Sequence, residues 1–252
     1  MQNAHVRDYR ALVNQLQGSL DRDQMGTLGE ISTKGRIYPL LKVVLGNGNP
    51  KRALISAGIH GNESAGVEAI REYLGCKGYR QCIQEWEITL LPCLNPWGYE
   101  FDRRENYEQK DLNREFKSNT PPLEVTCIQP ILQQPFHLAL ELHEDAKSSG
   151  YYLYLGGKTG NELELGEQIL NTVKEVIPLN LDSKIDGEKA NQGIIERGCG
   201  EVNGERWPMA VYTLAHGSQA CYTLETSGLF LMKTRISSHL IAIQTALENF
   251  PT

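Results

Sequence analysis

A histidine and a glutamate stand three residues apart in His60-Gly61-Asn62-Glu63, directly after the apolar run at 53–59. Imidazole nitrogen and carboxylate oxygen are both ligands of Zn²⁺, and a catalytic zinc site needs three protein ligands with one position open for water. Both side chains can face one ion if the intervening turn opens a helix, and Gly61 lets the backbone bend there. An isolated pair of this kind is common at exposed helix starts, so the prediction of a metal site depends on a third ligand.

The third ligand is expected at His143, which ends the apolar segment 136–144. His143 therefore has the same position relative to its strand that His60 has relative to 53–59. Open α/β sheets place their sites at the carboxyl ends of such strands. The other histidines have no such position. His137 is predicted to be a packed or half-exposed strand residue, and His216 a turn residue. His5 and His239 are predicted to lie on terminal helices.

Charged residues follow two further apolar segments. The loop after 86–96 contains Arg104 and Arg114, and arginine can hold a carboxylate through two parallel charge-assisted hydrogen bonds. Because this loop mixes both charge signs, a solvated loop is the alternative interpretation. Glu225 ends another apolar run, where a carboxylate is costly unless it is paired or linked to a metal. A structural salt bridge and a catalytic role both explain that position.

The elements that must position these residues follow an alternating pattern. Strands are predicted at 35–45, 53–59, 86–96, 136–144 and 151–157, with two more within 210–228; helices are predicted at 4–20, 68–74, 123–133, 162–176 and 233–250; irregular structure is predicted at 97–119 and 178–207. The pattern predicts an α/β three-layer sandwich with a mixed, mostly parallel sheet. No repeat or linker interrupts it, so residues 1–252 are expected to form one catalytic domain.

Composition narrows the classes of function. The formal net charge of −6 argues against a nucleic-acid binder and against binding to an anionic membrane. Six cysteines are spread without a CxxC pair and are expected to be mostly buried and reduced. The N-terminus lacks the apolar core of a signal peptide, and no apolar run reaches membrane-spanning length. We therefore expect a cytoplasmic enzyme with a small substrate; the sequence does not indicate its oligomeric state.

Several motifs occur in one fixed order: HGNE at 60–63, NPWG at 95–98, Arg104, DLNREF at 111–116, LHE at 142–144 and TLET at 223–226. In this order they resemble the zinc carboxypeptidase superfamily, the M14-type metallopeptidases. That superfamily also contains the succinylglutamate desuccinylase and aspartoacylase deacylases. The resemblance covers residues 35 to 230 and implies a zinc carboxypeptidase/phosphorylase-like sheet of about eight strands between helices.

The resemblance also implies roles for individual residues: one Zn²⁺ held by His60, Glu63 and His143, a general base at Glu225, an oxyanion-stabilising arginine at Arg104, and a carboxylate-binding pair at Asn113 and Arg114. Many peptidases of the family place a tyrosine upstream of the base. Neither Tyr212 nor Tyr222 has that spacing, so no tyrosine is assigned. Glu144 and Asp145 are expected to support the site or to lie at the surface rather than to bind a second metal.

Two hydrolytic functions fit these motifs. A metallocarboxypeptidase or peptide amidase is favoured because HGNESAG and NPWGYEF resemble compact peptidases and the chain leaves little room for the extra C-terminal domain of deacylases. The alternative is an N-acyl amino acid deacylase of the desuccinylase or aspartoacylase type. The stretch 193–207 and the strand residues before Glu225 are expected to form the specificity pocket. Arg197 and Arg206 could select an acidic side chain there, but the favoured interpretation is that they face solvent. A zinc-binding protein without catalysis is disfavoured because the base and both arginines are present.

Overall fold

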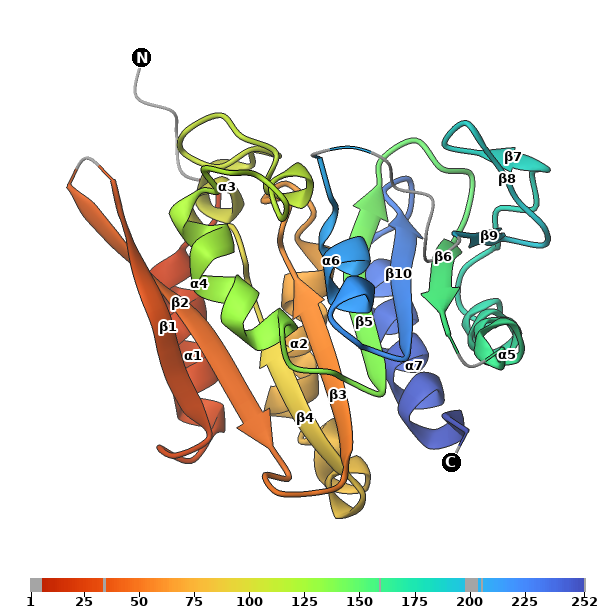
Figure 1. The fold of residues 1–252 in the computed structure, drawn as a ribbon, viewed down its shortest axis with the longest axis horizontal. Helices are drawn as coiled ribbons and strands as arrows, with labels where there is room; N and C mark the ends of the chain where they lie inside the picture. The colour runs from red at the N-terminus through yellow and green to blue at the C-terminus, as the bar shows by residue number, and fades with distance from the viewer. Residues whose placement is uncertain (1–5, 34, 159, 198–203, 205, 252) are drawn as a thin grey trace.

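The computed structural model describes residues 6–33, 35–158, 160–197, 204 and 206–251 (Figure 1). Eight strands form one sheet in the order β1-β2-β4-β3-β5-β10-β6-β9. Their bounds are β1 Met25–Thr33, β2 Arg36–Leu45, β3 Lys51–Ala57, β4 Trp86–Leu91, β5 Leu138–Asp145, β6 Tyr152–Gly157, β9 Ile194–Glu196 and β10 Ala220–Ser227. The pairings β3–β4, β3–β5, β5–β10 and β6–β9 are parallel and the other three are antiparallel. The predicted mixed sheet of eight strands is confirmed.

Helices cover both faces of the sheet, which gives the three layers that the sequence predicts (Figure 1). One face is covered by α1 Tyr9–Ser19, α2 Ala65–Gly75, α5 Glu162–Val173 and α7 Met232–Asn249, and the other by α4 Leu123–Leu132 and α6 Met209–Ala215. Shorter elements are α3 Pro96–Phe101, the 3-10 turns Gly78–Arg80, Cys82–Gln84 and Leu112–Arg114, and the hairpin of β7 Lys184–Ile185 and β8 Glu188–Lys189.

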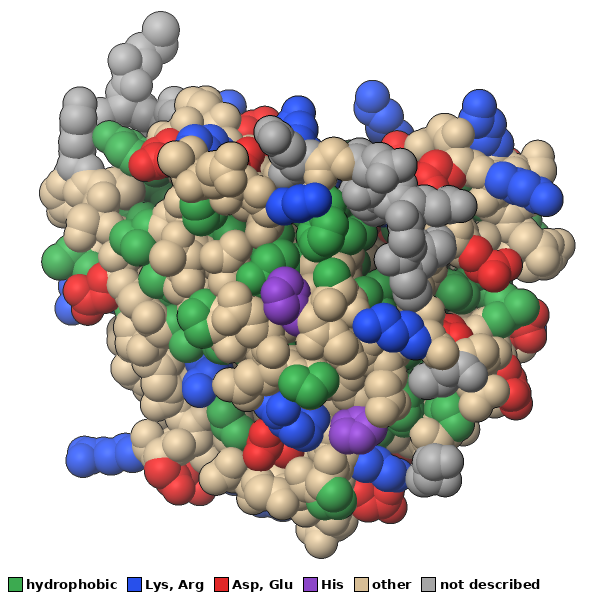
Figure 2. Space-filling model, viewed as in Figure 1, with side chains coloured by type: hydrophobic (Ala, Val, Ile, Leu, Met, Phe, Trp, Pro, Cys, Tyr) green, Lys and Arg blue, Asp and Glu red, His purple; other side chains and the backbone are tan. Residues whose placement is uncertain are grey.

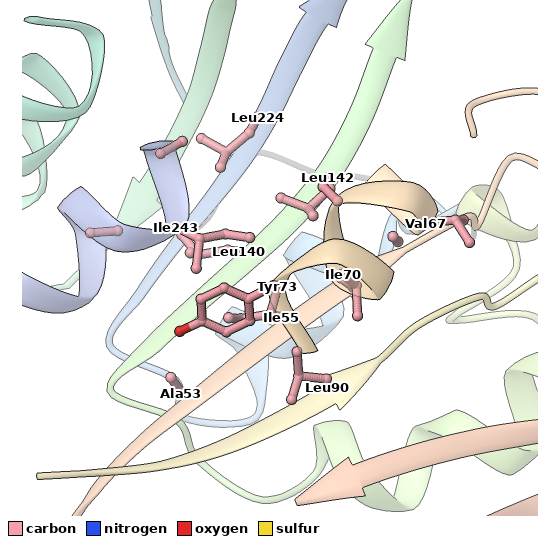
Figure 3. Packing of buried hydrophobic residues seen from close by; sticks show 14 of the residues in the cluster. Ala53, Ile55, Val67, Ile70, Tyr73, Leu90, Leu140, Leu142, Leu224 and Ile243 are labelled. Carbon is pink, nitrogen blue, oxygen red and sulfur yellow. The ribbon is translucent and has the colours of Figure 1, made fainter. Parts of the chain in front are cut away.

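Each face of the sheet has its own apolar cluster, and this explains why the central strands are continuous apolar runs. Figure 3 shows Ile70 of α2 and Ile243 of α7 gathered with the sheet residues Ile55, Leu140 and Leu224. The cluster on the opposite face joins α4 and α6 to the strand residues whose side chains point to that face. The strands are thereby fixed between two layers, and their carboxyl ends provide a rigid platform for the site.

Four segments differ from the prediction. The segment 178–207 was predicted to be irregular, but it contains β7, β8 and β9. Residues 210–216, predicted as a strand, belong mostly to α6, where Met209, Tyr212 and Thr213 are buried at the i, i+3, i+4 spacing of a helix. Their β-branched and aromatic residue types caused the error, because packing overrides such local preferences. The segment 97–119 was predicted to be irregular, but it begins within α3 and contains a 3-10 turn. Strand β1 was not predicted, since its exposed GTLGEIST sequence lacks an apolar run.

Other expectations concern the surface and the thiols. The helix expected at 4–20 is α1, and His5 lies outside the described residues. Among the described cysteines, Cys82, Cys93 and Cys221 are buried and unpaired; Cys199 lies outside the described residues. In the described part of the chain, no helix has the length and apolar character needed to cross a membrane. Acidic and basic side chains are intermingled on the face drawn in Figure 2.

Candidate metal-dependent active site

Three buried side chains meet at the carboxyl ends of β3 and β5. His60 follows β3, Glu63 precedes α2, and His143 lies near the end of β5. The Nδ1 atom of His60 lies 2.7 Å from one carboxylate oxygen of Glu63, and the Nδ1 atom of His143 lies 2.8 Å from the other. All three potential ligand atoms lie within 4.8 Å of one another. The structure therefore brings together the three residues that the sequence nominates as metal ligands.

The detailed geometry of these side chains suits a shared cation. The Nδ1 atom of His60 is buried and makes no hydrogen bond with any described residue, although a Glu63 oxygen is only 2.7 Å away. Burial raises the pKa of Glu63, but the adjacent His143 and His60 outweigh this effect and lower it overall. Two imidazole nitrogens and a carboxylate oxygen form the donor set of many catalytic zinc sites. The group can thus hold a divalent metal ion of that class.

Asp111 supports this group, a role that the sequence interpretation missed. One carboxylate oxygen of Asp111 lies 3.1 Å from Nε2 of His60, on the far side of the ring from Glu63. The other accepts hydrogen bonds from Nε and a terminal nitrogen of Arg104 at 3.3 and 3.2 Å. The pKa of Asp111 is lowered because His60 and Arg104 together outweigh its burial. A carboxylate behind a ligating histidine fixes the orientation of its ring.

Glu144 fixes the start of α2, just after Glu63. Its side chain accepts a hydrogen bond from the backbone N–H of Ala65 at 2.5 Å and forms an ion pair with Arg235 of α7. Ser64, which precedes the helix, makes no side-chain cap. The backbone N–H of Glu144 also donates to Glu63 at 3.1 Å. Glu144 is therefore a cap supplied from another element, and it supports the site as the sequence predicts.

Gly61 and the NPWG motif allow the metal-binding loop to pack against α3. A Cβ atom added at Gly61 would lie 2.0 Å from the carbonyl carbon of Gly98, so no side chain fits there. The side chain of Asn95 accepts from Gly98 N at 2.9 Å and donates to the carbonyl of Arg104 at 3.2 Å. The motif is thus a structural joint that places Arg104 beside the metal-binding group.

Arg104, Asn113 and Arg114 line one cleft of about 370 Å³ together with the metal-binding group. A terminal nitrogen of Arg104 lies 3.2 Å from Glu63. Asn113 is buried, and its side-chain oxygen accepts from Met209 N at 2.8 Å. Arg114 donates to the backbone carbonyl of Asn113 at 2.7 Å. The two arginines thus supply cationic donors to the cleft.

Glu225 lies beside His143 because their strands pair in parallel register. Its side chain is half-buried and lines the cleft. Burial raises the pKa of Glu225 to about 8; the neighbouring His143 lowers it and the Glu63 carboxylate raises it further. A carboxylate with a raised pKa in a cleft is suited to proton transfer near neutral pH.

The cleft contains further residues that were not predicted. Tyr152 pairs in register with Glu225 and donates to Asp145 at 3.2 Å, and Tyr154 lies one row further down the sheet. Glu141, two residues before His143, also lines the cleft. Strand alternation places Glu141 and His143 on the same face, so the sequence contained a signal for Glu141. Nothing local in the sequence indicated the two tyrosines.

Tyr212, Tyr222 and the other described histidines that the sequence left without a role do not line this cleft. The ring of Tyr212 packs against Phe116, while the Tyr222 hydroxyl donates to the carbonyl of Glu162. The remaining described histidines, His137, His216 and His239, occupy the start of β5, the end of α6 and the buried face of α7. Of the two loop arginines, Arg206 is exposed and Arg197 lines the cleft. Residues 198–203 and 205 of the expected specificity segment lie outside the described residues.

Several solved structures share the fold of this chain. The chain shares its fold with a candidate metallopeptidase from Shewanella denitrificans, with a TM-score of 0.81 and 21% identity over 96% of this chain and 90% of the other. A candidate metallopeptidase from Shewanella amazonensis has a TM-score of 0.80 and 20% identity over 96% and 93% of the two chains. A metallo-carboxypeptidase from Burkholderia cenocepacia has a TM-score of 0.67 and 16% identity over 96% and 69%.

Family membership rests on sequence. No curated protein sequence matches the chain significantly. Residues 49–228, well over half of the chain, match the succinylglutamate desuccinylase/aspartoacylase catalytic domain family. This span includes every residue of the candidate site, from His60 to Glu225. The chain therefore belongs to the succinylglutamate desuccinylase/aspartoacylase catalytic domain family.

Proposed function

We propose that the protein is a zinc-dependent hydrolase that cleaves an amide bond next to a free carboxylate, as a metallocarboxypeptidase or peptide amidase. One observation carries the proposal: a single cleft contains a metal-binding group, an adjacent carboxylate and two arginines, namely His60, Glu63, His143, Glu225, Arg104 and Arg114. This combination supplies every group that hydrolysis of such a bond requires.

Bound by His60, Glu63 and His143, Zn²⁺ would lower the pKa of its water to about 7 and polarise the scissile carbonyl. Glu225 stands beside His143 and is positioned to take the proton of the attacking water and to pass it to the leaving amine. Arg104 faces the same space and can donate to the carbonyl oxygen as negative charge develops on it.

The substrate's carboxylate would bind at the turn Leu112–Arg114. Arg114 offers a planar guanidinium, which matches a carboxylate through two parallel hydrogen bonds. The side-chain oxygen of Asn113 is already bonded to Met209 N, so its NH₂ group is the end directed to a ligand. Both residues line the cleft, and together they would fix the position of the scissile bond relative to Glu225.

The acyl part of the substrate separates two versions of this function. The chain shares its overall fold with the candidate metallopeptidases from Shewanella, which supports a peptide substrate. The family match supports the alternative, an N-acyl amino acid deacylase. The same catalytic residues and the same carboxylate-binding turn would serve both, because each reaction releases an amino acid.

The test compares wild type with Glu225→Gln on C-terminally free peptides and on N-acyl amino acids. Loss of the general base should lower kcat by about 10²- to 10⁴-fold while the bound zinc is retained. Hydrolysis of peptides supports the peptidase, and hydrolysis of only the N-acyl series supports the deacylase. If zinc-loaded wild type hydrolyses neither series, or if Glu225→Gln remains fully active, the proposal is wrong.

A further inference from the structure

The carboxylate of Glu141 has no role in the chemistry above, although it lies in the same cleft. It stands two residues before His143 on β5, so both side chains leave the sheet on the same face. Glu141 is only 2% exposed. A buried carboxylate of this kind is costly unless a cation or several donors compensate its charge. Its surroundings therefore indicate what the cleft is built to bind.

The protein itself provides little compensation. The Cys221 thiol lies 3.9 Å from one oxygen of Glu141, and Nε2 of His143 lies 3.8 Å from the other, too far for a normal hydrogen bond. A thiol is a weak donor. Among the described residues, no lysine or arginine nitrogen forms an ion pair with Glu141 within 4.0 Å. A cationic group of a ligand could therefore pair with the Glu141 carboxylate.

Strand register places Glu141 one row deeper in the cleft than the proposed catalytic row. His143 pairs with Glu225, and Glu141 pairs with Thr223, which in turn pairs with Tyr154. Two residues along a strand correspond to about 7 Å. A substrate whose scissile bond lies beside His143 and Glu225 could therefore extend a long side chain to the row of Glu141.

The other charged side chains near this row do not make the net charge around Glu141 positive. Arg197 also lines the cleft, but its guanidinium forms an ion pair with Glu188 at 2.6 Å and stacks on the Tyr154 ring at 4.0 Å. Asp186 adds a further carboxylate, which accepts from the Tyr154 hydroxyl at 2.9 Å. The positive charge of Arg197 is thus already balanced by Glu188, and no lysine or arginine of the described residues forms an ion pair with the buried carboxylate of Glu141.

We propose that Glu141 is a specificity residue that selects a leaving amino acid with a cationic side chain, an ammonium or a guanidinium. The cationic end would pair with the Glu141 carboxylate while Arg114 holds the substrate's carboxylate. This inference rests on the proposed function, but it applies equally to a peptide and to an N-acyl amino acid, because both release the same amino acid.

The experiment measures kcat/KM for benzoylglycyl and N-acetyl derivatives of lysine, arginine, norleucine and glutamate. Norleucine has a similar aliphatic chain without the ammonium. Wild type should prefer lysine or arginine over norleucine by roughly 10- to 100-fold, the effect of one charge-assisted hydrogen bond in a buried site. In Glu141→Gln the preference should shrink to about threefold or less, with hydrolysis of the norleucine substrate nearly unchanged.

Glu108→Gln is the control, because it removes an exposed carboxylate that does not line the cleft and should leave the preference intact. Preference of wild type for norleucine or glutamate would overturn the proposal. So would an equal loss on all substrates together with lower zinc content in Glu141→Gln, since Glu141 would then serve only to orient His143.

A binding measurement separates this proposal from the proposed function. Calorimetry would compare free lysine with free norleucine as ligands of zinc-loaded wild type and of Glu141→Gln. Tighter binding of lysine to wild type only would support the role of Glu141 even if neither substrate series is hydrolysed. Equal binding of the two amino acids to wild type would overturn the proposal, whatever the hydrolytic activity.

Discussion

At the scale of single residues, the site is a chain of contacts that begins behind the metal-binding group. Asp111 contacts His60 and Arg104, His60 and Arg104 both contact Glu63, and Glu63 contacts His143. A change at one member therefore alters the orientation of the next. Removing a group behind a ligating histidine commonly weakens metal binding without removing a ligand.

Asp111→Asn tests this chain of contacts. The variant keeps the shape of the side chain but loses the charge that faces His60 and Arg104, so zinc affinity should fall about 10- to 100-fold. Competition with a chromophoric chelator measures this change. Glu108→Gln, an exposed carboxylate on the same loop, is the control and should bind zinc like wild type. Unchanged affinity in Asp111→Asn would show that Asp111 does not orient His60.

The sequence identifies a residue as part of the site when that residue lies within a recognisable motif. His60, Glu63, His143, Arg104 and Glu225 each follow an apolar strand, and parallel strands end at one edge, so their meeting could be foreseen. Roles that depend on contacts across the sheet could not. Tyr152 reaches the cleft only because β6 runs antiparallel beside β10, and no short-range pattern specifies that pairing.

At the scale of elements, the position of Glu63 depends on how α2 begins. Glu144 replaces the missing cap at Ser64 and ties α2 to Arg235 of α7. The ion pair is largely buried: the Arg235 side chain is 19% exposed and that of Glu144 is 5% exposed. Removing one partner of such a buried ion pair leaves the charge of the other partner without compensation.

Glu144→Gln should therefore lower the free energy of unfolding of the metal-free protein by about 1–3 kcal/mol. It should also weaken zinc binding, because Glu63 would lose its fixed position at the start of α2. Urea denaturation in the presence of a chelator measures the first effect. The double variant with Arg235→Met should recover part of the loss, since it no longer buries a lone cation. Wild-type stability in Glu144→Gln would contradict the capping role.

The more deeply an element is buried, the more readily the sequence predicts where it lies. Strands β3, β5 and β10 are covered on both faces, and their continuous apolar sequences identify them. Edge strand β1 and the short helix α6 were missed because their formation depends on neighbours rather than on local periodicity. Helix α6 nevertheless matters for the site, since its first backbone N–H holds the side chain of Asn113.

At the scale of the whole molecule, the sheet is held between two apolar layers and its strands end at the cleft. The loop between α3 and α4 also lines this cleft. This loop carries Arg104, Asp111 and Arg114. It is attached to α4 by Asn106, whose side-chain nitrogen lies 3.2 Å from both carboxylate oxygens of the buried Glu124. The stability of the fold and the position of these charged residues are thus linked through one buried carboxylate.

Glu124 should make global stability depend on pH. Burial raises its pKa above the ordinary value of 4.5. The folded state therefore prefers protonated Glu124, a contribution that is full below pH 4.5 and is lost as the pH rises through the folded-state pKa. Glu124→Gln stays neutral, so its stability relative to wild type should rise as the pH increases through the folded-state pKa of Glu124. Denaturation of both metal-free proteins between pH 4 and 8 measures it; a constant difference would contradict the argument.

We propose that His60, Glu63 and His143 hold one zinc ion. The most direct test is elemental analysis of protein that has been stripped with a chelator, incubated with Zn²⁺ and freed of excess metal. We predict about one zinc per chain in wild type and in the control His137→Ala, and a marked loss in His143→Ala. A wild-type protein that retains no zinc, or a His143→Ala variant that retains as much as wild type, would show that these three residues do not form the zinc site.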